Sequence, residues 1–235
     1  MTLYVGTSGY SYKEWKGSFY PEKIAAKDML PYYASRLQAV ELNNTFYRLP
    51  QPSMVESWKA QVPDNFRFSV KASQRITHFK RLKDVAAETQ FMLETVSALE
   101  DRLGVVLFQL PPNMKKDLER LETFLKDLPA ATPAAFEFRH PTWFDDDVLA
   151  LLRSQNRALC VSDTDDLPTN HIDKTADWGY LRLRRVQYSE ADLKDWIKRV
   201  RAQEWKNTFV FFKHEDEGTG PKLAAQFLAL NEAAD

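Results

Sequence analysis

Charged and amide side chains recur at the ends of short β-prone segments in this chain of 235 residues, and their types suit acid–base chemistry and anion binding. Glu41 and Glu137 are the candidates for proton transfer, because paired carboxylates act as general acid and base in glycoside hydrolysis and in isomerisation. Arginine binds phosphate or carboxylate through two parallel hydrogen bonds, so a basic cluster indicates an anionic ligand. The side chains predicted to bind the substrate are Asn43, Lys71, Gln109, Arg139, Arg182, His78 and Asp163.

Aromatic residues are concentrated in the segment 7–20, which could supply a stacking surface for a sugar or a base. Tyr10 and Tyr12 are the candidates from this segment, and Tyr47 is the candidate from the segment after residue 42. The alternative is that these rings fold over the site as a small hydrophobic cluster of their own, to which Trp15 is assigned.

Metal and nucleophile chemistry have less support. A metal site would need several of Glu41, Glu137, Asp163, His140 and His214 to converge, but HExxH and paired Cys/His spacings are absent from the sequence and the neighbouring cations oppose a metal. No cofactor is therefore predicted, and a divalent metal is kept as a minor alternative. The sequence also lacks the GxSxG pattern of serine hydrolases.

Eight β-prone segments, most of them followed by helical periodicity, would position these side chains. Eight strands in 235 residues give about 29 residues per unit, the spacing of βα repeats in a barrel. We predict one α/β domain over residues 1–235, a single TIM-like (β/α)8 barrel, with an open doubly wound sheet as the alternative. The strands are expected at 3–6, 39–42, 66–71, 105–110, 135–139, 158–162, 180–183 and 208–213.

Helix signals follow most of these strands. Apolar residues fall on one face at 118–128, 193–200 and 223–230, so that each face can cover a sheet. Ser53 with Glu56, and Ser189 with Asp192, have the spacing of a capping box. The segment 164–177 is polar and contains a proline, so the sixth helix is predicted to be short or missing.

Alternation along the strands predicts which residues face the barrel interior. Val40 and Leu42 suit the helix-facing side, which turns Glu41 and Asn43 inward. Most inward polar residues lie at the C-terminal ends of the strands, where barrel active sites occur. Together with Asp163, the inward residues comprise six cations and three carboxylates, and this excess predicts a basic pocket. The alternative is that they pair into a buried ion network without chemistry. The six cations are Arg67, Lys71, Arg139, Arg182, Arg184 and Lys213.

Composition restricts the class of protein. The formal net charge of -1 argues against general binding to nucleic acids or membrane surfaces, which usually requires a basic excess. A single cysteine, Cys160, cannot form an internal disulfide and suits a reducing compartment. The chain shows no secretory signal and no apolar run of membrane-spanning length, so we expect a cytoplasmic protein without a membrane partner. Its oligomeric state is not predicted.

Five segments resemble the family called domain of unknown function 72, also known as YecE-like proteins. They are GTSGYSYKEWKGSFYP at 6–21, VELNNTFYRLP at 40–50, FRFSVKASQRITH at 66–78, LGVVLFQLPP at 103–112 and FEFRHPTW at 136–143. The resemblance implies a TIM-like barrel but no established activity. The family usually has His-Gly after the seventh strand and Asn residues after the eighth. This chain departs there: Arg182 fits the family pattern, whereas Arg184, Lys213 and His214 do not.

We predict an enzyme that acts on a small anionic or phosphorylated substrate, sugar-like molecules included, at the C-terminal mouth of the barrel. Hydrolase chemistry and isomerase or lyase chemistry are not distinguished. One alternative is a protein that binds nucleic acid or processes phosphodiesters, with phosphates on the basic residues and bases on the tyrosines. Another is a non-catalytic interaction module.

Overall fold

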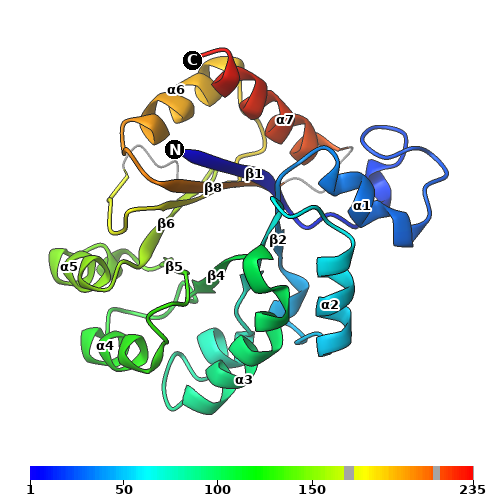
Figure 1. Ribbon diagram of the computed structural model, residues 1–235. Helices are drawn as coiled ribbons and strands as arrows, with labels where there is room; N and C mark the ends of the chain where they lie inside the picture. Colours follow the sequence, from blue (N-terminus) through cyan, green and yellow to red (C-terminus); the bar gives the residue numbers. More distant parts are fainter. Residues whose placement is uncertain (167–171, 214–217, 235) are drawn as a thin grey trace.

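Eight parallel strands close into a barrel in which each strand pairs with the next along the chain and β8 pairs with β1 (Figure 1). The structure is a computed structural model that describes residues 1–166, 172–213 and 218–234. The predicted TIM-like barrel is therefore confirmed, with strand ends within two residues of those expected. The strands are β1 (Thr2–Ser8), β2 (Ala39–Leu42), β3 (Arg67–Lys71), β4 (Leu103–Gln109), β5 (Ala134–Glu137), β6 (Ala158–Asp163), β7 (Gly179–Leu183) and β8 (Asn207–Phe212).

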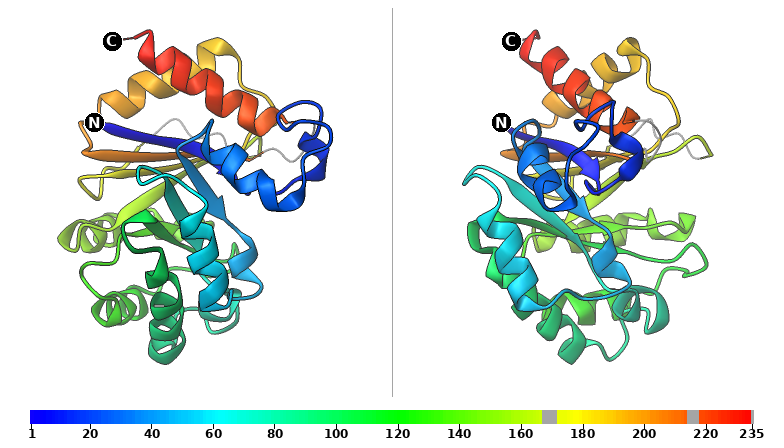
Figure 2. Two further views of the ribbon diagram at one scale, coloured as in Figure 1. Left: turned by 45° about the vertical axis from the view of Figure 1, so that its right-hand side comes forward. Right: turned by 90° about the vertical axis from the view of Figure 1, so that its right-hand side faces the viewer.

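Helices surround the barrel. The last two, α6 and α7, lie together beside β1 and β8, and α2 to α5 cover the opposite side (Figures 1 and 2). Between β6 and β7 the described residues contain no helix, as predicted for the sixth unit; residues 167–171 of this connection lie outside the description. The helices are α1 (Met29–Ala34), α2 (Pro52–Ala60), α3 (Ala86–Val96), α4 (Leu118–Asp127), α5 (Asp146–Ser154), α6 (Glu190–Arg201) and α7 (Thr219–Glu232).

Of the two predicted capping boxes, one is present. The Ser189 side chain accepts a hydrogen bond from the Asp192 amide, and the Asp192 carboxylate accepts one from the Ser189 amide. The box at Ser53 and Glu56 is wrong, because Ser53 already lies inside α2, which begins at Pro52 with Gln51 as its N-cap. The fixed φ of proline is already helical, which favours this residue in the first helical position.

The interior of the barrel is apolar toward the N-terminal ends of the strands and polar toward their C-terminal ends. Ala39, Leu107, Cys160 and Phe209 belong to the apolar interior cluster, whereas Val40 and Leu42 pack in the outer layer, which confirms the predicted alternation. Arg67 begins β3 and lies at the N-terminal end, where its guanidinium lies 5.4 Å from the centre of the Tyr4 ring. Its inclusion among the cations of the pocket was therefore wrong.

Gly6 allows β1 and β2 to approach closely. A Cβ atom at this position would lie 1.7 Å from the backbone carbonyl oxygen of Ala39, its partner in the sheet. Gly6→Ala is expected to reduce the free energy of unfolding by about 1–3 kcal/mol, the usual cost of overpacking. Urea denaturation checks this. Gly104→Ala is the comparison, because its new methyl group would meet the Phe209 side chain instead of backbone. Equal, small losses in the two variants would contradict the packing argument.

Candidate functional site

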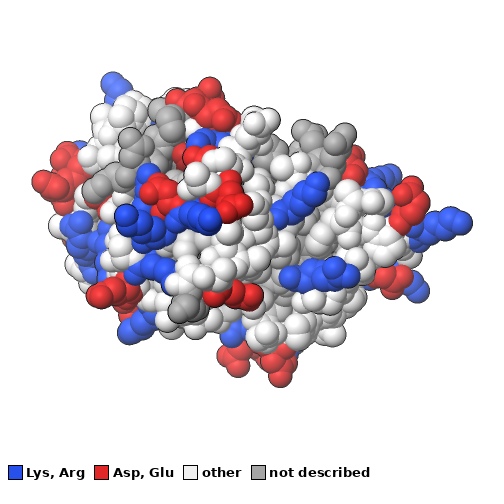
Figure 3. All heavy atoms as spheres, turned by 90° about the horizontal axis from the view of Figure 1, so that it is seen from above, with Lys and Arg blue, Asp and Glu red and all other residues white. Residues whose placement is uncertain are grey.

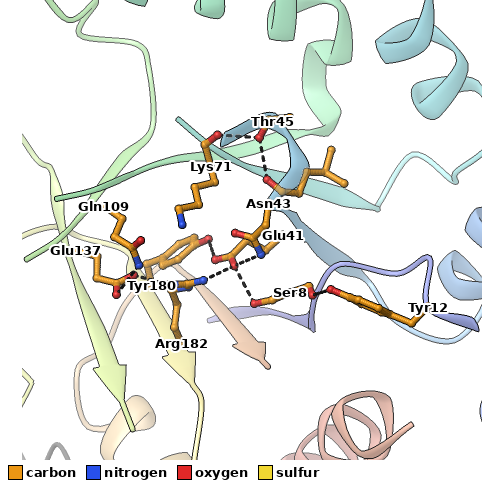
Figure 4. A network of polar contacts seen from close by, with 11 residues as sticks. Ser8, Tyr12, Glu41, Asn43, Thr45, Lys71, Gln109, Glu137, Tyr180 and Arg182 are labelled. Atoms are coloured by element: carbon orange, nitrogen blue, oxygen red, sulfur yellow. Dashed lines mark hydrogen bonds and ion pairs between the residues drawn. The ribbon is translucent and has the colours of Figure 1, made fainter. Parts of the chain in front are cut away.

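The centre of the candidate site is the guanidinium of Arg182, which bridges two buried glutamates inside the barrel (Figure 4). Its Nη2 donates to Glu41 Oε1 at 2.9 Å, and its Nη1 donates to Glu137 Oε2 at 2.6 Å. The three side chains come from β2, β5 and β7, and none is more than 3% exposed. The structure thus brings together three residues that strand alternation placed on the inner face. We call Glu41, Arg182 and Glu137 the buried triad.

Glu41 is surrounded by hydrogen-bond donors. In addition to Arg182, Ser8 Oγ donates to Oε1 at 2.8 Å, Asn43 Nδ2 donates to the same oxygen at 3.0 Å, and the Tyr180 hydroxyl donates to Oε2 at 2.7 Å. Burial alone would raise the pKa of Glu41, but the charge of Arg182 and these hydrogen bonds outweigh it and lower the pKa to about 2. Glu41 is therefore ionised throughout the neutral range.

Glu137 is held in the same way by fewer donors. Gln109 Nε2 donates to its Oε1 at 2.8 Å. Burial opposes ionisation, yet the charges of Arg182 and Arg184 lower the pKa of Glu137 below its usual value. At neutral pH neither carboxyl carries a proton to donate. In this arrangement the two carboxylates hold Arg182 in place. This corresponds to the buried ion network without chemistry, the alternative considered from the sequence.

Lys71 ends β3 beside the triad, and its amine points toward the interior of the site (Figure 4). Its Nζ lies 4.1 Å from the centre of the Phe46 ring. Burial lowers the pKa of Lys71, the nearby charge of Arg182 lowers it further, and the value falls to about 8. Within the described part of the chain, the amine has neither a hydrogen-bond acceptor nor a carboxylate in contact.

Further cations lie around Lys71. Burial and the charge of Arg182 lower the pKa of Arg184, whose Nε is buried without a hydrogen-bond partner among the described residues. Arg139 is exposed. Burial lowers the pKa of His78, and the charges of Lys71 and Arg139 lower it further. The His78 ring packs edge-on against Phe46 at 4.8 Å. Lys71, Arg184 and Arg139 form the cationic mouth, and His78, whose lowered pKa leaves it neutral at pH 7, borders it.

The basic excess around the triad can be counted from the described residues. Lys71, Arg182 and Arg184 against Glu41 and Glu137 leave one positive charge, and Arg139 adds a second. Lys213, also predicted for the pocket, directly follows β8 and is half-buried. Asp163 does not belong to this balance. It lies on the same side of β6 as Val161, in the outer layer, and accepts hydrogen bonds from Arg185 Nε at 2.7 Å and the Tyr188 hydroxyl at 2.9 Å. Its assignment to the substrate site is therefore not supported.

The predicted aromatic surface is mostly packed away. The Tyr12 ring lies 4.8 Å from the buried Trp15, and its hydroxyl donates to the Ser8 carbonyl oxygen at 2.7 Å. Tyr10 packs against Tyr33 at 6.2 Å. These contacts agree with the alternative of a separate hydrophobic cluster, and they leave Tyr10 and Tyr12 poorly placed for stacking on a ligand. Tyr47 is 73% exposed, which leaves it accessible to a ligand.

Sequence reasoning did not predict Ser8 or Tyr180 as partners of the triad. Strand alternation turns Tyr180 inward together with Arg182, and Ser8, on the inner face of β1, could have been identified in the same way. Their polarity gave no signal, because hydroxyl groups near strand ends are common in any barrel.

Other features do not add a second site. Among the described residues, no three His, Cys, Asp or Glu side chains gather in a way that could hold a metal ion; His214 lies outside them. A surface hollow of about 240 Å³ lies beside α4, lined by residues that include Asp84, Asp117 and Arg120. Within the same part of the chain, no helix is both long enough and apolar enough to cross a lipid bilayer.

Fold and site together define a class: a parallel α/β barrel with its polar side chains gathered at the C-terminal ends of the strands, where barrel enzymes carry their active sites. Residues 4–235 match the family described as "Protein of unknown function DUF72". The chain belongs to this family, which confirms the resemblance seen in the sequence.

Relatives extend over most of the chain. UPF0759 protein YunF from Bacillus subtilis (strain 168) is 25% identical over 269 residues, 97% of this chain and 94% of that protein. UPF0759 protein YecE from Escherichia coli (strain K12) is 32% identical over 143 residues, 60% and 50% of the two chains. A solved DUF72 family protein from Thermotoga maritima MSB8 is 29% identical with a TM-score of 0.85, and the match covers 99% of this chain and 100% of that protein. D-psicose 3-epimerase from Clostridium cellulolyticum H10, at 11% identity and a TM-score of 0.59 over 100% and 96%, shares the fold alone.

Proposed function

We propose that this protein is an enzyme that acts on a small metabolite carrying a phosphate or carboxylate group, bound at the cationic mouth. One observation carries the proposal: Lys71 and Arg184 lie beside a triad whose two carboxylates are already engaged by Arg182. Unpaired cations that are partly buried are costly, and an anionic ligand would compensate them.

The neighbouring side chains suit the rest of such a ligand. Asn43 Oδ1 is buried without a hydrogen-bond donor among the described residues, and Gln109 comes from β4 beside Glu137. We assign both amides to substrate hydroxyl or carbonyl groups. We assign the triad a structural role: its carboxylates hold Arg182 in place and set the local charge. This replaces the proton transfer by Glu41 and Glu137 that was expected from the sequence.

A nucleic acid is the less favoured ligand. The face above α6 and α7 carries basic and acidic side chains interspersed, not a continuous basic surface (Figure 3). On α6, Lys194 pairs with Glu190 at 2.6 Å, and Arg199 pairs with Asp195. This face therefore offers no continuous basic surface for a phosphate backbone. Tyr10 and Tyr12, on which bases were expected to stack, pack against Tyr33 and Trp15 instead.

Thermal denaturation in the presence of a panel of phosphorylated and carboxylated metabolites tests the proposal. At least one compound is expected to raise the melting temperature at millimolar concentration, because a ligand that binds only the folded state stabilises it. Arg184→Gln should reduce this shift strongly. Arg75→Gln is the matched control, since Arg75 is an exposed arginine already engaged by Glu88 at 3.2 Å. No shift with any compound, or equal shifts in both variants, would contradict the proposal.

A further inference from the structure

The backbone of Lys71 is firmly positioned. Lys71 pairs with Leu107 of β4, and its carbonyl oxygen accepts a hydrogen bond from the Thr45 hydroxyl at 2.7 Å (Figure 4). The same hydroxyl donates to the Leu42 carbonyl oxygen at 2.9 Å, so Thr45 ties the ends of β2 and β3 together. The lysine stem therefore starts from a fixed point at the C-terminal end of the barrel, where a reacting group must be held in place.

The surroundings of the Lys71 amine differ from those of other lysines. Lys59, Lys80 and Lys116 each contact a carboxylate, at 2.7 Å from Glu100, 2.7 Å from Glu88 and 2.5 Å from Asp145. The Lys71 amine lies over the Phe46 ring, and the charges that disfavour its protonated form are Arg182 and Arg184. The ring face and the charges of Glu41 and Glu137 favour the ammonium, but burial and the two guanidinium groups outweigh them.

We propose that Lys71 is the nucleophilic amine of this site, and that it condenses with the carbonyl group of a small aldehyde or ketone whose phosphate or carboxylate is held by Arg184 and Arg139. This inference rests on the proposed function and narrows its substrate to an anionic carbonyl compound. A desolvated lysine beside other cations is one of the known ways in which proteins activate an amine.

The reaction balances without a cofactor. The lone pair of neutral Nζ attacks the carbonyl carbon, a C–N bond forms, and the π electrons of the carbonyl pass to its oxygen. The two amine protons move to that oxygen, which leaves as water, and a C=N bond remains. The imine withdraws electrons from the neighbouring carbon and so favours bond cleavage or proton loss there.

At neutral pH a larger fraction of the Lys71 amine is unprotonated, and therefore nucleophilic, than in an ordinary lysine. Its pKa of about 8, against the usual 10.5, means that at pH 7 the neutral fraction is on the order of 300-fold larger. The neutral fraction rises with pH, so imine formation should increase with a midpoint near pH 8. An exposed lysine would continue to gain reactivity well above that pH.

Borohydride trapping with pyridoxal 5′-phosphate tests the inference, since this probe carries both an aldehyde and a phosphate. The full-length protein is incubated at pH 7 with a low concentration of the probe. Sodium borohydride then reduces each imine to a stable secondary amine, and peptide mass spectrometry locates the label. We expect Lys71 to be labelled more than about tenfold faster than any other lysine. Pyridoxal without the phosphate should label it less.

Two matched variants sharpen the result. Lys71→Arg keeps the charge but removes the amine, so the fast label should disappear while the melting temperature changes little. Lys80→Arg replaces an ion-paired lysine that also follows β3, and this variant should retain the fast label on Lys71. Labelling spread evenly over the lysines would overturn the inference.

Failure of the inference and failure of the proposed function remain distinguishable. Even labelling together with stabilisation by phosphorylated metabolites would leave an anion site without a nucleophilic lysine. Fast labelling of Lys71 by pyridoxal and its phosphate alike would overturn the anion site and leave the reactive amine.

Discussion

Arg182→Leu is expected to reduce the free energy of unfolding by about 3–5 kcal/mol, the usual cost of breaking a buried ion pair. The substitution would leave Glu41 and Glu137 ionised, buried and without their shared cation. Leucine is shorter than arginine and cannot offset either charge. Urea denaturation at pH 7 measures the loss, which is expected to be the largest for any single substitution in the barrel interior.

A triple variant provides the control. Combining Arg182→Leu with Glu41→Gln and Glu137→Gln removes all three charges, and most of the lost stability should return. Replacement of a whole buried ion cluster by neutral groups is often close to neutral in free energy, whereas removal of one partner is not. If Arg182→Leu alone cost less than about 1 kcal/mol, the two glutamates would not both be ionised in the folded protein.

Acid should destabilise the protein through Glu41. The pKa of Glu41 in the folded state is about 2, below the ordinary 4.5, so the unfolded chain takes up a proton first as the pH falls. The contribution of ionised Glu41 to the free energy of unfolding is complete above about pH 5 and is lost as the pH falls toward 2. About 3 kcal/mol is expected over this interval from Glu41. The depressed pKa of Glu137 acts in the same direction.

Unfolding free energies between pH 2.5 and pH 6 check this expectation, with Glu41→Gln as the comparison. The variant is less stable at pH 6, but its stability should fall less steeply on acidification because it lacks the carboxyl that titrates. Parallel pH profiles for the two proteins would show that Glu41 does not have a depressed pKa.

The fold could be predicted from the sequence because each strand repeats the same local pattern. Val40 and Leu42 against Glu41, and Phe68 and Val70 against Lys71, identify the two faces of a strand without knowledge of its neighbours. The lack of a helix among the described residues between β6 and β7 could be predicted for a similarly local reason, the polar composition of 164–177.

Errors arose where position along a strand mattered as well as its face. Arg67 has inward parity, but it begins its strand and so lies at the wrong end of the barrel. Asp163 lies at the correct end but on the other face, one residue beyond Ser162. Both positions could have been read from the predicted strands 66–71 and 158–162, whose limits lie within one residue of the observed ones.

The partners of the triad depend on packing across the barrel and could not be predicted. Glu41 and Arg182 are 141 residues apart, and their contact follows from the closure of the barrel. For the same reason the sequence could not decide whether the tyrosines of the first loop line the mouth or pack against Trp15.

The central claim is that Arg184, with Arg139, holds an anion at the cationic mouth beside the buried triad. A crystal structure determined with a phosphorylated metabolite, or with inorganic phosphate, is the most direct test. We predict an anion within hydrogen-bond distance of the Arg184 guanidinium, with Arg182 still bound to Glu41 and Glu137. A structure in which a carboxylate of the protein itself occupies Arg184, with the anion elsewhere, would contradict the claim.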